Sequence, residues 1–355
     1  MPAWVCLPYD RVSPKSAIAS ERIDTLTRLA RPRAGGNVCR ITLTTVNAFL
    51  QRVPAPETYR DACFSAVKGE TIELEALTDF LVKNGYGRAE TVMEPGEYAV
   101  RGGLIDVFPP GLDGPVRLDL FGDVVEGIRG FDPLTQRSEG NLQSVELKPV
   151  SEVLLNQVTV ARFRENYRDL FGAVTEEDPL YQAVSAKRRH PGMEHWLALF
   201  HQLLEPLLAY LPDAVVTLAH QAEQARDARL EAIADYYQAR RDFTITGFAA
   251  DGAVYHPVPP ERLYLVGDEW DRRLGERPVG VFSPFTGPAT GPRRFDAGGK
   301  PGHDFTAARQ QAGVQLFDAV TADIKEHQAA GRRVVVAGHS AGSLDRLSGL
   351  LRDHG

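Results

Sequence analysis

The segment Gly338-His339-Ser340-Ala341-Gly342 has the residue types of a serine hydrolase. In this G-x-S-x-G pattern, a serine on a tight turn between a strand and a helix acts as the nucleophile, and an acid and then a histidine follow on later strands. Only 13 residues follow Gly342, and no strand is predicted among them. The acid and base they could supply are Asp345, Asp353 and His354. We therefore expect a glycine-rich turn, and we keep an α/β-hydrolase-type serine esterase as the alternative function.

Other patterns of phosphate or metal chemistry are incomplete. Gly298-Gly299-Lys300 superficially suggests a P-loop, but Pro301 stands where Ser or Thr must hold Mg²⁺, and Arg294 replaces the first glycine. The acidic run at 176–178 is typical of a solvated loop. The nine histidines form no HExxH motif, and Cys6, Cys39 and Cys63 have no CxxC spacing. We expect no catalytic residue, no metal ion and no bound cofactor in this chain.

A binding surface is predicted on the strand that ends at Gly122-Asp123. Glycine supplies the positive φ that a two-residue hairpin turn demands, so the runs 116–121 and 124–131 should pair. Alternation then places three residues in the core: Val116, Leu118 and Leu120. It places six on the outer face: Arg117, Asp119 and Phe121, with Val124, Glu126 and Ile128 opposite them.

This outer face has two interpretations. Asp119 opposite Glu126 is unfavourable unless a cation lies nearby, and Arg101 on the preceding strand is the expected cation. A solvated face with one exposed phenylalanine is one interpretation. The other is a protein-binding patch made by Arg101, Arg117 and Phe121, because arginine and aromatic residues anchor interfaces.

The composition limits the class of protein. A hydrophobic fraction of 43% in 355 residues can bury a large core, which excludes wholesale disorder. The longest apolar runs fall short of a membrane span, and the N-terminus lacks the pattern of a signal peptide, so we expect a cytoplasmic protein. A net charge of −7 argues against a chain-wide nucleic-acid surface but leaves a local basic patch open.

The helices and strands that must position these residues can be predicted from the spacing of hydrophobic residues and from the glycines and prolines that end them. The helices that we predict are Ser16–Leu29, Glu73–Lys83, a helix from Trp196 to Leu211 broken at Pro206, Gln221–Arg241 and Phe305–Ala329. The predicted strands are Val38–Leu43, strands within Gly96–Phe108 and within Val116–Phe131, a buried strand at Val215–Leu218, Leu263–Val266 and Arg332–Ala337. Glycines and prolines at 275–302 predict a linker.

Several of these runs together resemble a known family. Three of them resemble the UvrB-homology module of bacterial nucleotide-excision repair: GEYAVRGGLIDVFP at 96–109, VRLDLFGD at 116–123 and FDPLTQRS at 131–138. Three further runs resemble the transcription-repair coupling factors (Mfd) more closely than UvrB: Leu7-Pro8-Tyr9-Asp10, Ser20-Glu21-Arg22 and GMEHW at 192–196. The similarity extends from about Trp4 to about Leu218.

The resemblance implies an α/β fold class with several parts. Residues 1–63 would be a truncated UvrB-like domain 1a of parallel-sheet, nucleotide-binding type, and 151–274 would be domain 1b, which completes it. Between them, 64–150 would be UvrB-like domain 2, a small β-rich α+β domain. Residues 275–304 would be a Gly/Pro linker, and 305–355 the start of a further, partial α/β domain.

The resemblance also implies a function. In the family the small β-rich domain binds UvrA, and the matching positions here are Arg101, Arg117 and Phe121. The family's full-length protein is an ATP-driven double-stranded-DNA translocase that displaces stalled RNA polymerase. This sequence lacks the family's motor, and we expect it to start after the degenerate Walker A loop. We therefore expect an adaptor without ATPase activity, with ATP and Mg²⁺ used by the parent's motor and no membrane partner.

Overall fold

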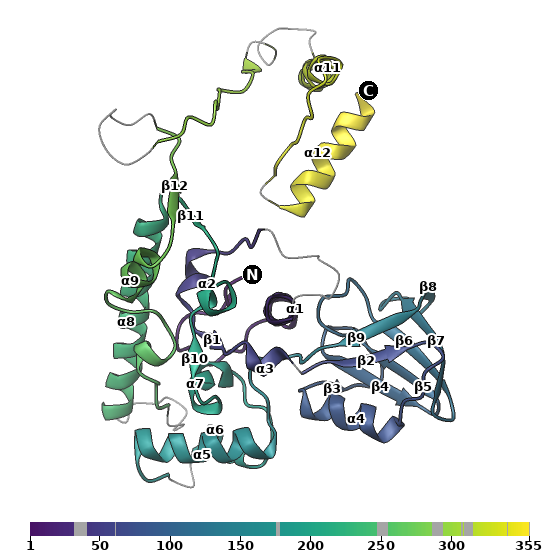
Figure 1. Ribbon diagram of the computed structural model, residues 1–355, viewed down its shortest axis with the longest axis vertical. Helices are drawn as coiled ribbons and strands as arrows, with labels where there is room; N and C mark the ends of the chain where they lie inside the picture. Colours follow the sequence, from purple (N-terminus) through teal and green to yellow (C-terminus); the bar gives the residue numbers. More distant parts are fainter. Residues whose placement is uncertain are drawn as a thin grey trace. The chain divides into compact units, whose positions relative to one another are not determined.

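The computed structural model describes most of the chain in two compact units. The described residues are 1–31, 41–60, 62–174, 178–246, 255–285, 294–306, 308, 315–338 and 340–354. The units are Met1–Thr286 and Gly287–Gly355 (Figure 1). Within the described residues, every helix is too short or too polar to span a bilayer.

A small mixed sheet in the first unit contains the predicted hairpin. Its strand order is β3-β4-β5-β6-β7-β8, and all neighbours are antiparallel except β3 and β4. The bounds are β3 Gly87–Arg88, β4 Glu97–Arg101, β5 Leu104–Val107, β6 Val116–Phe121, β7 Val124–Phe131 and β8 Ser138–Leu142. Helix α4 (Leu74–Lys83) lies against one face of this sheet (Figure 1).

The face of the sheet under α4 is a hydrophobic core. Leu77 and Leu81 of α4 are fully buried there with Ile105, Leu118 and Ile128 of the strands. A two-stranded antiparallel sheet, β2 (Phe64–Val67) with β9 (Ser144–Leu147), adds Ala66, Val145 and Leu147 to the same core. The helix predicted at Glu73–Lys83 and its glycine terminator are confirmed, since Gly85 has a φ of +87°.

The hairpin predicted at Gly122-Asp123 is confirmed, with one error of register, and the strand region predicted within Gly96–Phe108 forms β4 and β5. Gly122 has a φ of +62° in the turn between β6 and β7, and Phe121 pairs with Val124. A β-bulge in β7, opposite the step from Asp119 to Leu120 in β6, then shifts the pairing, so that Ile128 pairs with Leu118 and is buried. The prediction that Ile128 shares the outer face with Arg117 is therefore wrong, because a bulge exchanges the two faces of the strand.

The rest of the first unit is mainly helical around a large aromatic core. Its longer helices are α1 Ser16–Ala30, α5 Gln157–Phe171 and α8 Ala222–Thr246. Shorter helices and helical turns are α2 Val46–Leu50, α3 Glu57–Arg60, α6 Pro179–Ser185, η1 Met193–Trp196, α7 Leu197–Phe200, η2 Leu207–Tyr210, η3 Pro260–Arg262 and α9 Glu269–Gly275. The core is formed by Phe163, Tyr167, Leu197, Phe200, Tyr264 and their neighbours. The helices predicted at Ser16–Leu29 and Gln221–Arg241 are confirmed.

Two short sheets complete the first unit. Strand β1 (Val53–Pro54) is antiparallel to β10 (Leu204–Glu205), and β11 (Val216–Ala219) is parallel to β12 (Val279–Phe282). The break of the helix predicted at Trp196–Leu211 is confirmed, since η1, α7, β10 and η2 are separate short elements. The strand predicted at Val215–Leu218 exists as β11, but its side chains are exposed or half-buried rather than buried. Strand β12 lies within the predicted linker.

Two other strand predictions fail in the first unit. Residues 38–40 lie outside the described residues, and Ile41 and Leu43 are exposed in a segment without strand structure. At 263–266 only Tyr264 makes a bridge, to Gln51. Apolar and β-branched residues form a strand only where a neighbouring strand pairs with them. The composition of these two segments was therefore insufficient to predict a strand.

The described residues of the second unit include the helices α11 and α12. Helix α11 (Leu316–Ala329) confirms the second half of the helix predicted from Phe305, while 307 and 309–314 lie outside the described residues. Helix α12 (Ala341–Asp353) follows an extended segment at 332–338. The strand predicted at Arg332–Ala337 is not formed, and Val335 is 75% exposed.

A buried ion pair joins α1 to the segment that leaves the small sheet. Arg22 is fully buried, and its Nε lies 2.5 Å from Oε1 of Glu152. The same guanidinium donates to the carbonyl of Pro2 (2.7 Å) and to Oε1 of Gln51 (3.1 Å). A buried charge has lost its hydrating water, and the hydrogen bonds to its partners compensate for that loss. Removal of either Arg22 or Glu152 therefore leaves the other charge buried and uncompensated.

Replacing Arg22 by alanine should lower the free energy of unfolding by about 3–5 kcal/mol, because Glu152 would stay buried and unpaired. Arg28→Ala is the matched control: the side chain of Arg28 is 62% exposed beside Asp24 and should cost at most about 1 kcal/mol. Chemical denaturation measures both. The double variant Arg22→Met/Glu152→Met should regain much of the loss. Equal losses for Arg22→Ala and Arg28→Ala would contradict this account.

His195 should make the fold sensitive to acid. It is buried against Trp4, its Nε2 lies 3.9 Å from Sγ of Cys6, and burial lowers its pKa from 6.5 to about 4. As the pH falls, the imidazole of His195 is therefore protonated in the unfolded chain before it is protonated in the folded chain. The free energy of unfolding falls between pH 6.5 and pH 4, by about 3 kcal/mol in total.

Denaturation of the His195→Gln variant at pH 7 and pH 4.5 tests this prediction. The variant should lose less stability on acidification than the unchanged chain. Burial raises the pKa of the neighbouring Glu194, which acts in the opposite direction but is common to both proteins. His220→Gln, at an exposed histidine, should leave the pH dependence unchanged. An unaltered pH dependence in His195→Gln would refute the assignment.

Candidate functional site

Phe121 is the most exposed aromatic side chain of the small sheet. It ends β6 at the β6–β7 turn, and it is 76% exposed. The predicted outward orientation is confirmed. Large apolar side chains are normally buried, so an exposed one on an ordered strand is a candidate for protein contact.

The strand ends around Phe121 are held firmly. The N–H of Ile72 donates to the carbonyl of Asp123 (2.6 Å), and the N–H of Val125 donates to the carbonyl of Glu70 (2.9 Å). In the neighbouring hairpin, the carbonyl of Gly103 accepts from the N–H of Leu120 (2.8 Å). A Cβ at Gly103 would lie 2.5 Å from the carbonyl oxygen of Leu120, so only glycine fits there. Phe121 is therefore presented on a preorganised backbone.

Arg101 lies on the same face at the end of β4. Its side chain is half exposed, donates to the carbonyl of Glu90, and has Nη1 3.8 Å from Oδ2 of Asp106. A guanidinium has five N–H donors in a fork that suits a carboxylate. Arg101 is thus placed to bind a carboxylate from another molecule.

Arg117 is on the outer face as predicted, but its guanidinium has a partner within the chain. Nε and Nη2 donate to the two carboxylate oxygens of Asp106, at 2.7 and 2.8 Å. These hydrogen bonds raise the pKa of Arg117. The guanidinium also lies 4.9 Å from the centre of the Phe131 ring, and its side chain is only 17% exposed. Arg117 neutralises the buried carboxylate of Asp106 beneath the exposed face.

The cation beside Asp119 differs from the prediction. Asp119 forms an ion pair with Arg129 of β7, not with Arg101. It lies opposite Gly127, since the bulge moves Glu126 out of register. Sequence reasoning missed Arg129 for this reason. It also missed Leu104, which is 38% exposed opposite Asp119. The Gly102-Gly103 hairpin and simple alternation along β5 could have identified Leu104.

Ser340 has a structural role in the described residues. It is the N-cap of α12, and its Oγ accepts from the N–H of Ser343 (3.2 Å) in a capping box. His354 is bonded instead to Asp318, with Nδ1 2.7 Å from Oδ1. His339 lies outside the described residues. The elbow of a hydrolase also needs a preceding strand, which 332–337 do not form.

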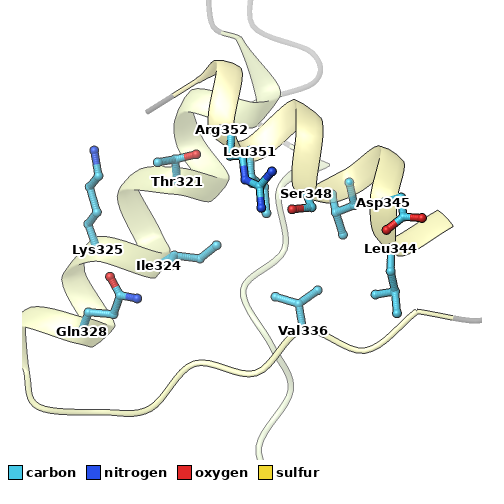
Figure 2. Close-up of a pocket in the computed structure, with 11 residues that line it drawn as sticks. Thr321, Ile324, Lys325, Gln328, Val336, Leu344, Asp345, Ser348, Leu351 and Arg352 are labelled. Atoms are coloured by element: carbon cyan, nitrogen blue, oxygen red, sulfur yellow. The ribbon is translucent and has the colours of Figure 1, made fainter. Parts of the chain in front are cut away.

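A pocket in the second unit lies between α11, α12 and Val336 (Figure 2). Its volume is about 540 Å³, and its lining is mainly apolar, with polar groups at Lys325, Gln328, Asp345 and Arg352. The lining residues, all described, include no histidine or cysteine. The hydroxyl groups that line it, from Thr321 and Ser348, therefore have no histidine base within the lining.

The remaining candidate groups do not assemble into a site. Cys6 and Cys63 are free thiols, and Cys39 lies outside the described residues, as do 176 and 177. Asp178 is buried as the N-cap of α6 and bonds to the N–H of Tyr181 (2.9 Å) and the hydroxyl of Tyr167, which corrects the solvated loop predicted for it. Among the described residues, no cluster of three or more His, Cys, Asp or Glu side chains could hold a metal ion.

Alanine at Arg117 should destabilise the small sheet, because Asp106 would stay buried without its two hydrogen-bonded partners, and only the guanidinium of Arg101 would remain near it, at 3.8 Å. We expect a loss of about 3–5 kcal/mol, against less than about 0.5 kcal/mol for Phe121→Ala at an exposed site. Thermal unfolding and urea titration measure both. In a double-mutant cycle, adding Asp106→Ala to Arg117→Ala should restore part of the stability. Additive losses would show that the two side chains are not coupled.

Comparisons with known proteins agree with the resemblance that the sequence motifs indicate. A family described as the UvrB interaction domain matches residues 64–152. The transcription-repair-coupling factor of Haemophilus influenzae is 32% identical over 284 residues, which is 79% of this chain and 24% of that protein. The factor of Escherichia coli is 33% identical over 269 residues (75% and 22%), and that of Bacillus subtilis is 26% identical over 266 residues (70% and 22%).

The chain spans about a quarter of the length of the curated relatives that it matches. The resemblance that the motifs indicate is therefore confirmed over most of this chain, and the segment around Phe121 lies within the matched domain. The chain belongs to the transcription-repair coupling factor family and contains a UvrB interaction domain.

Proposed function

We propose that residues 64–152 recruit the damage-recognition protein UvrA, and that the chain acts as an adaptor in transcription-coupled nucleotide-excision repair. The observation that carries this proposal is Phe121, 76% exposed on a turn that backbone hydrogen bonds hold in place. It is supported by the UvrB interaction domain match over the same residues. A rigid aromatic group loses little conformational entropy on binding, which suits an interface anchor.

Each residue of the predicted site has a distinct part in this proposal. Phe121 enters an apolar pocket of UvrA, and the half-exposed guanidinium of Arg101 pairs with a UvrA carboxylate. Arg117 supports the face by neutralising Asp106. A variant at Arg117 would therefore confuse a loss of contact with a loss of stability, so it is unsuitable as a first test of binding.

The remainder of the first unit belongs to the same proposal. Residues 1–63 and 151–274 would together form a UvrB domain 1-like fold that the small β-rich domain interrupts. The β1–β10 ladder and the Arg22–Glu152 ion pair join the two stretches. In a full-length coupling factor we propose ATP-driven translocation on double-stranded DNA and displacement of RNA polymerase. The chain itself would use neither ATP nor Mg²⁺.

Binding of purified UvrA to the chain, followed by size-exclusion chromatography and titration, tests the proposal. Phe121→Ala should weaken the binding of UvrA about 30-fold or more. Arg101→Ala should also weaken binding, and it should make the dissociation constant less dependent on salt concentration. Leu134→Ala is the matched control, because Leu134 is an 80% exposed apolar side chain at the β7–β8 turn, at the other end of β7. It should bind as the unchanged chain does.

Thermal unfolding must show that these three variants are as stable as the unchanged chain. Absence of UvrA binding by the unchanged chain, or undiminished binding by the Phe121→Ala/Arg101→Ala double variant, would refute the proposal. Strong binding of duplex DNA with a steep salt dependence would point to a DNA clamp instead.

A further inference from the structure

Two further apolar side chains are exposed beside Phe121. Val124 is 41% exposed and pairs directly with Phe121 across the β6–β7 hairpin. Leu104 is 38% exposed and pairs with Asp119, which is two residues before Phe121 and so on the same face. Leu104, Phe121 and Val124 form what we call the apolar strip, across the ends of β5, β6 and β7.

The apolar strip is open to a partner. Both hairpin turns that border it contain glycine, Gly102 in one and Gly122 in the other. A Cβ built on either glycine would have no atom of another part of the chain within 4 Å. The Ile72 and Val125 backbone bonds fix the β6–β7 end, and the Leu120–Gly103 bond joins it to the β4–β5 end. A partner can therefore approach the strip without displacing side chains or reordering backbone, which lowers the cost of binding.

The charges around the strip indicate the chemistry of the partner. Arg101 pairs with Leu104 across the β4–β5 hairpin and lies half exposed at one border. Asp119 at the other border is already bound by Arg129. Exposed Asp123 and Glu126 on the β6–β7 hairpin would repel phosphates, which argues against a nucleic acid or an anionic lipid surface. The surface suits a protein with an apolar groove and a carboxylate at one rim.

We infer that the apolar strip as a whole, rather than Phe121 alone, is the contact surface for UvrA, with Leu104 and Val124 as determinants of affinity. This inference rests on the function proposed above and deepens it. An aromatic anchor gains most when neighbouring apolar groups exclude water around it, and Leu104 and Val124 are the groups placed to do so. The partner groove should therefore be long enough to cover three strands.

The test measures the dissociation constant of UvrA from the full chain with Phe121 unchanged. Val124→Thr keeps the shape and β-propensity of the side chain while adding a hydroxyl, and Leu104→Thr shortens the other end of the strip. Each should weaken binding about tenfold, and the double variant about a hundredfold. The dependence of binding on salt should stay as in the unchanged chain, since Arg101 is intact.

Matched controls carry the same changes elsewhere. Leu134→Thr and Val158→Thr alter exposed apolar residues of the β7–β8 turn and of α5, and both should bind UvrA normally. If Leu104→Thr and Val124→Thr bind normally while Phe121→Ala does not, the inference fails and the proposed function stands. If the unchanged chain does not bind UvrA, the proposed function itself fails, and the inference with it.

Discussion

The structure of the first unit depends on one buried guanidinium. Arg22 is on α1, near the start of the chain, and Glu152 lies just after the small sheet, 130 residues later. Arg22 also holds Pro2 and Gln51, so four separate stretches of chain meet at a single charge. Because a buried charge without its partners is costly, this constellation permits one arrangement of these stretches and disfavours others. Two more ion pairs extend it along α1: Asp24 with Lys148 (2.5 Å) and Arg31 with Glu146 (3.0 Å).

These ion pairs fix one end of the β2–β9 sheet, which shares the hydrophobic core of the small sheet, and leave the other end available. At one end of the β2–β9 sheet, Phe64 pairs with Leu147 near the ion pairs. At the other end, Val67 pairs with Ser144, and the chain continues into residues 69–72. Residues 69–72 in turn bond to the β6–β7 hairpin that carries Phe121. Tight anchoring and exposed apolar surface thus occur at opposite ends of β2. This separation explains how a surface can be apolar and exposed without weakening the fold that supports it.

The outer face shows how one residue type can have two roles. Arg101 and Arg117 both alternate outward, and sequence alone treats them alike. Their contacts with Asp106 distinguish the two arginines. Arg117 donates hydrogen bonds to both carboxylate oxygens of Asp106, whereas Arg101 lies 3.8 Å from this carboxylate and is half exposed. Substitution of the two arginines should therefore have different consequences, one for stability and the other for binding.

The sequence by itself determined the local elements and the family. The hydrophobic period and the breaker residues predicted α1, α4, α8 and the β6–β7 hairpin, because helix faces and glycine turns depend on neighbouring residues. The exposure of Phe121 followed from the same alternation. Tertiary structure decided what depends on distant partners: the β-bulge that buried Ile128, the Arg129 partner of Asp119, and the absence of strands at 41–43 and 332–337. A strand or an ion pair needs a second segment, and the sequence of the first segment does not specify where that second one lies.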